Sequence, residues 1–81
     1  MSEILVVDDD EQVLNVLGEM LRLEGHEVVT ADNGRIAVEL LGAQGFDLVI
    51  TDLIMPEKEG LETISDMRNI NAEMPIIAIS G

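Results

Sequence analysis

The sequence has no cysteine, tryptophan or tyrosine, and Phe46 is its only aromatic residue. Without cysteine, the chain can form neither a disulfide framework nor a cysteine-ligated zinc site. Without more aromatics, any hydrophobic core has to be aliphatic. Hydrophobic residues nevertheless make up 47% of the 81 residues, which is enough for one small globular domain and argues against a disordered segment.

Basic residues are also scarce. Four Lys and Arg residues stand against 17 Asp and Glu residues, so the formal net charge at pH 7 is −13. Such a charge repels phosphate backbones and anionic lipid headgroups, and we expect no direct contact with nucleic acid or membrane. A cation or a basic partner fits the charge better. No apolar run approaches the ~18 residues of a membrane span, and Met1-Ser2-Glu3 does not begin a signal peptide, so we expect a cytoplasmic location.

Short apolar runs alternate with segments of helical period along the chain. The runs predict strands at residues 4–7, 28–31, 47–51 and 76–79, and the segments predict helices at 11–24, 35–41 and 61–70. In the first helical segment the apolar residues are Val13, Leu14, Val16, Leu17, Met20, Leu21 and Leu23. We expect Asp10 to cap this helix and Gly25 to end it. The alternating order predicts an α/β fold, a doubly wound parallel sheet with helices on both faces.

Acidic residues gather where two of the predicted strands end. Asp8 and Asp9 directly follow the first strand, and Asp52 follows the third. Parallel strands end at the same edge of a sheet, so three carboxylates converge there if these two strands are neighbours. At ~4 Å and an effective dielectric constant near 20, each pair of carboxylates repels by about 4 kcal/mol.

A positive charge has to offset this repulsion. A proton, a lysine or a divalent cation can supply it, but Lys58 is the only lysine in the sequence. Carboxylate oxygens completed by water suit Mg²⁺, which prefers hard oxygen ligands. We therefore predict a Mg²⁺ site at Asp8, Asp9 and Asp52. For Asp10 we expect only the role of a helix cap, where its charge also favours the helix dipole.

The motifs resemble the receiver domain of two-component response regulators. The resemblance rests on ILVVDDDE, DLVITDLIMPEKEG and PIIAISG, in that order, and extends over essentially the whole chain. It implies a flavodoxin-like (CheY-like) fold and a single receiver domain over residues 1–81. It also implies a phosphoacceptor that takes a phosphoryl group from a sensor histidine kinase or phosphotransfer protein and switches an output. Such a domain assists its own phosphorylation and dephosphorylation and is not otherwise an enzyme.

The resemblance also assigns roles to single residues. Asp52 matches the phosphoacceptor, and Mg²⁺ is the implied cofactor. Asp9 matches the direct metal ligand, and Asp8 matches the ligand that holds the metal largely through water. The backbone carbonyl of Ile54 matches the third protein ligand of the metal. Ser80 matches the hydroxyl residue that bonds a phosphoryl oxygen and reports phosphorylation.

The chain departs from the family's pattern at its end. The family's domain has five strands and five helices, whereas this chain stops after the fourth predicted strand. The last helix, strand and helix are absent, together with the lysine that pairs with the phosphoryl group. We therefore expect the N-terminal two-thirds of a receiver, in which strand 76–79 forms a sheet edge and favours a homodimer or a domain swap. The alternative is a non-phosphorylated interaction module or a folding fragment.

Two other classes of phosphate-binding protein fit the residues less well. A Mg²⁺-dependent phosphohydrolase of the haloacid dehalogenase type needs Asp-x-Asp-x-Thr/Val after the first strand, and here Gln12 stands in place of the Thr or Val. A dinucleotide-binding Rossmann unit needs glycines in the first turn between strand and helix, where this chain has aspartates.

Overall fold

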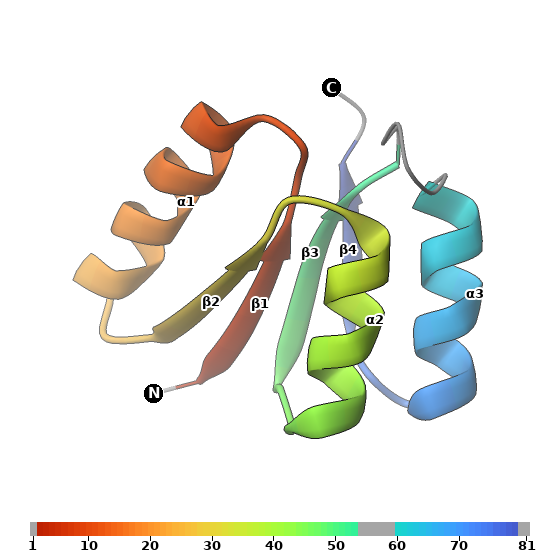
Figure 1. Ribbon diagram of the computed structural model, residues 1–81. Coiled ribbons are helices and arrows are strands. Elements are labelled where there is room, and N and C mark those ends of the chain that lie inside the picture. The colour runs from red at the N-terminus through yellow and green to blue at the C-terminus, as the bar shows by residue number, and fades with distance from the viewer. Residues whose placement is uncertain (1, 54–59, 80–81) are drawn as a thin grey trace.

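The computed structural model describes residues 2–53 and 60–79, which form a parallel sheet flanked by helices on both faces (Figure 1). The elements in chain order are β1 (Glu3–Val7), α1 (Glu11–Leu23), β2 (Glu27–Ala31), α2 (Gly34–Ala43), β3 (Leu48–Asp52), α3 (Gly60–Ile70) and β4 (Ile76–Ile79). The strand order is β2-β1-β3-β4, and every pair is parallel. The predicted doubly wound sheet is confirmed.

Strand order decides which helix covers which face. The chain moves from β1 outward to β2 and then crosses back past β1 to β3, so right-handed crossovers place α1 and α2 on opposite faces. Figure 1 shows α1 alone on one face, with α2 and α3 side by side on the other. All strands end at the same edge of the sheet, which we call the carboxyl edge.

The central strand β1 contributes to a core on each face because its side chains alternate. Leu5 and Val7 belong to the cluster under α2 and α3, and Ile4 and Val6 belong to the cluster under α1. The larger cluster also contains Ala31, Ala37, Leu41, Phe46, Val49, Met67 and Met74. The four side chains from Ile4 to Val7 are at most 2% exposed, which explains why this part of β1 is an unbroken apolar run.

Side-chain caps fix where the first two helices begin. The carboxylate of Asp10 accepts a hydrogen bond from the Gln12 backbone N–H at 2.9 Å, as predicted. The Asn33 side chain accepts from the Ile36 N–H at 2.9 Å, so α2 begins at Gly34, one residue before the predicted start. Gly25 follows α1 with φ of 90°, a left-handed conformation that glycine adopts without strain.

The third strand is shifted by one residue from the prediction. It runs from Leu48 to Asp52, and Asp52 pairs with Ile79 of β4. The predicted phosphoacceptor is therefore the last residue of the strand itself and is held by the sheet. β4 is an edge strand of the described sheet, and Ile77 is 50% exposed. Self-association through this strand stays a prediction.

Gly34→Ala is expected to destabilise the fold by about 1–3 kcal/mol, because it overpacks the contact between α2 and α3. A Cβ atom at this position would lie 2.0 Å from the Oγ1 atom of Thr63, and Thr63 is fully buried. Urea unfolding checks this. Gly42→Ala in the same helix is the matched control, because a Cβ there meets no atom within 4 Å. The control should be stabilising by about 0.5–1 kcal/mol. Equal effects of the two substitutions would contradict the packing argument.

Candidate metal centre

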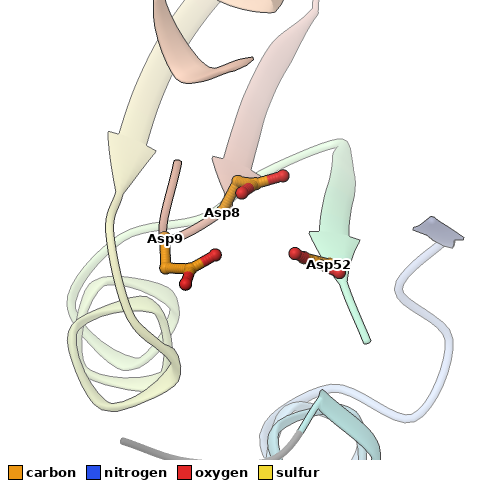
Figure 2. Close-up of side chains that lie close together, drawn as sticks. All are labelled: Asp8, Asp9 and Asp52. Carbon is orange, nitrogen blue, oxygen red and sulfur yellow. The ribbon is translucent and has the colours of Figure 1, made fainter. Parts of the chain in front are cut away.

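Three carboxylates meet at the carboxyl edge, where β1 and β3 end side by side (Figure 2). The two strands are paired with Val7 opposite Thr51, so the next residues, Asp8 and Asp52, lie at the same level of the carboxyl edge. One carboxylate oxygen from each of Asp8, Asp9 and Asp52 can be chosen so that all three lie within 4.8 Å of one another. The predicted convergence is confirmed for these three side chains.

Two hydrogen bonds fix the position of Asp8. Its N–H donates to the carbonyl of Ala31 at 3.1 Å, the hydrogen bond that closes the last pair of β1 with β2, Val7 opposite Ala31. Its Oδ1 atom accepts a hydrogen bond from the Asp10 N–H at 2.8 Å. Because the Asp10 side chain also caps α1, the start of the helix and the orientation of the Asp8 carboxylate are set by the same short turn.

The three carboxylates differ in their exposure to water. Asp8 is 5% exposed and Asp52 is 7% exposed, whereas Asp9 is exposed. Two full charges 4.8 Å apart repel by about 3 kcal/mol at an effective dielectric constant near 20, and by less where water screens the exposed Asp9. Burial raises the pKa of Asp8, and the carboxylates of Asp52, Asp9 and Asp10 raise it further, against the lowering effect of the Asp10 N–H. The cluster is therefore destabilising unless a cation or a proton joins it.

Asp8→Asn is expected to stabilise the protein at neutral pH when divalent cations are chelated. The amide oxygen of Asn can still accept the Asp10 N–H, while the buried charge is removed. The pKa of Asp8 is higher in the folded than in the unfolded state, so ionisation of Asp8 above its folded pKa costs stability. The advantage of the variant should therefore be full at pH 7 and shrink as the pH falls through the folded pKa toward the ordinary value of 3.8.

Urea unfolding at pH 7 and near pH 4, with EDTA present, measures this difference in stability. Glu39→Gln is the control, because it also removes one negative charge and Glu39 is exposed. Asp47→Asn is less suitable, because the Asp47 carboxylate accepts a hydrogen bond from the Glu3 N–H. An advantage of Asp8→Asn that grew on acidification would show that the pKa of Asp8 is shifted in the opposite direction.

The donor set fits Mg²⁺. All three groups are carboxylate oxygens, the ligands that this hard cation prefers, and no softer donor joins them among the described residues. Oxygens bound to one octahedral Mg²⁺ at 2.0–2.1 Å lie roughly 3–4 Å apart, so separations of up to 4.8 Å need only small side-chain rotations or an intervening water. Asp8, Asp9 and Asp52 can thus hold the cation together, with water completing its shell.

Two of the predicted site residues lie outside the described part of the chain. These are Ile54, whose backbone carbonyl is the predicted third protein ligand, and Ser80, the predicted hydroxyl residue. A further acidic residue, Asp32, directly follows β2 at the same carboxyl edge and is not among the predicted site residues. Its position after an apolar strand is the signal that could have identified it, by the same reasoning that identified Asp8 and Asp52.

Comparison with known proteins gives one family. The family model of the response regulator receiver domain matches residues 4–81. The chain is 36% identical over 81 residues to the transcriptional regulatory protein CpxR of Escherichia coli K12. It is 37% identical over 80 residues to the transcriptional regulatory protein GlrR of the same strain. These matches cover 100% and 99% of this chain but 34% and 18% of the two relatives, so the chain spans about a third or less of their length.

Solved structures show the same likeness. The response regulator protein TrrA of Thermotoga maritima, in complex with Mg²⁺-BeF, matches with a TM-score of 0.93 and 39% identity over 99% of this chain and 70% of that chain. TrrA in complex with the histidine kinase ThkA matches with a TM-score of 0.93 and 38% identity over 100% of this chain and 70% of that one. A CheY-like receiver domain protein of Methanospirillum hungatei matches with a TM-score of 0.97 and 28% identity, over 100% and 65%.

Proposed function

The chain belongs to the response regulator receiver family, and from this premise we propose that Asp52 accepts a phosphoryl group in a Mg²⁺-dependent reaction. One observation carries the proposal: the carboxylate of Asp52 lies at the carboxyl edge within 4.8 Å of two further carboxylates on the neighbouring strand end. A lone surface aspartate has no such neighbours. Three clustered carboxylates need a cation, and a cation is what an incoming phosphoryl group also needs.

The chemistry follows from the positions of these groups. An oxygen of Asp52 attacks phosphorus in line with the bond to the donor, an acyl phosphate forms, and the donor nitrogen or oxygen keeps the electron pair of the broken bond. Such transfers pass through a loose transition state, so positioning and charge stabilisation supply most of the catalysis. Bound Mg²⁺ would offset the charge on the phosphoryl oxygens. Asp9 and Asp52 would hold it directly and Asp8 largely through water, with the Ile54 carbonyl and the Ser80 hydroxyl in the roles that the resemblance implies.

The wider role proposed for the chain is signalling. The donor would be a sensor histidine kinase or a phosphotransfer protein, and the complex of TrrA with the histidine kinase ThkA supports a partner of this class. The chain would act as a phosphoacceptor and not as an enzyme with a separate substrate. In the described ranges no helix has the length and hydropathy needed to cross a membrane. A cytoplasmic location is part of the same proposal.

Binding of beryllofluoride tests the proposal without the cognate kinase. Beryllofluoride mimics a phosphoryl group on a carboxylate, and in TrrA a Mg²⁺-BeF complex has been solved. We expect a bound ¹⁹F NMR signal that needs Mg²⁺ and disappears with EDTA. No bound signal at saturating Mg²⁺ would favour the alternative, a receiver-like interaction module that is not phosphorylated.

A further inference from the structure

A second feature of the carboxyl edge is a pocket beside the metal cluster, between α1 and the turn from β2 to α2. Its volume is about 360 Å³. The residues that line it are Asp9, Glu11, Leu14, Asn15, Thr30, Ala31, Asp32 and Ile36. Asp9 belongs both to this pocket and to the metal cluster, so the two sites adjoin.

The lining combines negative charge with an apolar floor. Asp9, Glu11 and Asp32 are exposed carboxylates from three different segments. Beneath them lie Leu14 and Ala31, which are 6% and 3% exposed, and the half-buried Ile36. No basic residue lines the pocket in the described part of the chain. A group that fits both features has a cationic head and an apolar stem.

The pocket is too large for a single metal ion and falls at the lower end of the 300–1,000 Å³ typical of ligand pockets. An arginine side chain has a planar head with five N–H donors and an aliphatic stem of three methylenes. Its donors can reach carboxylates on separate walls at once, whereas the compact ammonium of lysine is held as a point charge and is more strongly hydrated.

We propose that this pocket binds an arginine side chain presented by a partner protein that approaches the carboxyl edge. The inference rests on the proposed function, because a protein that delivers a phosphoryl group to Asp52 must cover this edge and passes the adjoining pocket. The stem packs over Leu14 and Ile36, and the guanidinium group donates to the carboxylates of Glu11 and Asp32. One oxygen of Asp32 already accepts the Asn33 side-chain N–H at 3.2 Å, which holds this carboxylate in place.

The probe for this site is N-acetyl-arginine-N-methylamide, titrated into isotopically labelled protein without Mg²⁺ and followed by NMR. We expect saturable shifts of the amide signals of Asn15, Thr30 and Ile36 at millimolar probe. The citrulline analogue has nearly the same shape without the charge and should produce no saturable shift. Mg²⁺ should weaken binding of the arginine probe, because a cation bound at Asp9 offsets part of the negative charge of the adjoining pocket. The probe should weaken Mg²⁺ binding by the same factor.

Three variants locate the binding. Asp32→Asn removes one carboxylate and should weaken the probe roughly threefold to tenfold. Thr30→Arg places a competing guanidinium group at the pocket and should abolish binding. Glu73→Gln removes an equal charge from the connection between α3 and β4, at the opposite edge of the sheet, and should change the affinity by less than about twofold because salt screens distant charges.

Each outcome bears on the proposal. Absence of saturable binding overturns it, and so does equal weakening by Asp32→Asn and Glu73→Gln, which would indicate only general attraction to the acidic chain. Agmatine that bound at least tenfold more tightly than the arginine probe would overturn the protein partner in favour of a free small cation. Failure of the proposed phosphoacceptor function is distinguishable, because it appears as absent beryllofluoride binding while this titration uses neither Mg²⁺ nor a phosphoryl analogue.

Discussion

Asp52→Asn is expected to abolish phosphoryl labelling of the protein completely. The substitution keeps the shape of the side chain at the end of β3, so the pairing of β3 with β1 and β4 should persist. It removes the nucleophilic carboxylate, and an amide cannot form a stable acyl phosphate under these conditions. Intact mass spectrometry after incubation with acetyl phosphate and Mg²⁺ measures the labelling.

The matched control is Asp32→Asn, which changes another aspartate at the same carboxyl edge and should still be labelled. Circular dichroism should show that both variants keep their secondary structure. Labelling that persisted in Asp52→Asn and mapped to Asp8 or Asp9 would show that the phosphoacceptor has been assigned to the wrong carboxylate, while the metal cluster remained correct.

Asp9→Ala is expected to remove Mg²⁺ binding. Asp9 is the exposed carboxylate of the cluster, so it can bind the cation with the least loss of its own hydration. Its removal leaves two buried carboxylates, and one oxygen of Asp8 already accepts a hydrogen bond from the Asp10 N–H. Titration with Mg²⁺, followed by the NMR shifts of residues near Asp9 and Asp52, measures the affinity.

Asp10→Ala is the matched control, one residue further along the same turn. The Asp10 side chain caps α1 and lies outside the carboxylate cluster. Its loss should cost about 0.5–2 kcal/mol of stability through the missing cap and leave most of the Mg²⁺ affinity. Equal loss of Mg²⁺ binding in the two variants would mean that the metal ligands have been misassigned.

The sequence by itself determined the fold class and the acidic cluster. Strands buried on both faces must be apolar throughout, and the run from Ile4 to Val7 has this property. Because parallel strands end at one edge, aspartates after two such runs already indicated a shared site before any coordinates were known. The same reasoning applied to Asp32 would have added the third acidic segment of that edge.

The tertiary structure alone decided which side of α1 is buried. The helical period placed Val16, Met20 and Leu23 with the other apolar residues, yet these three are 57%, 57% and 85% exposed. Leu14, Leu17 and Leu21 face the sheet instead. The apolar residues of α1 occupy about half of its circumference, which is wider than the stripe that a sheet covers. Contact with β1 and β2 therefore decided which side of this apolar face is buried.

Packing also decided the features that no local pattern encodes. Gly34 directly precedes the predicted helix 35–41, but in the structure it is the first residue of α2, and its missing side chain lets Thr63 of α3 approach. The pocket beside Asp9 exists because α1, the end of β2 and the start of α2 come together. Local propensity depends on neighbours in the chain, whereas close approaches and pockets depend on residues distant in the chain that only the folded sheet brings together.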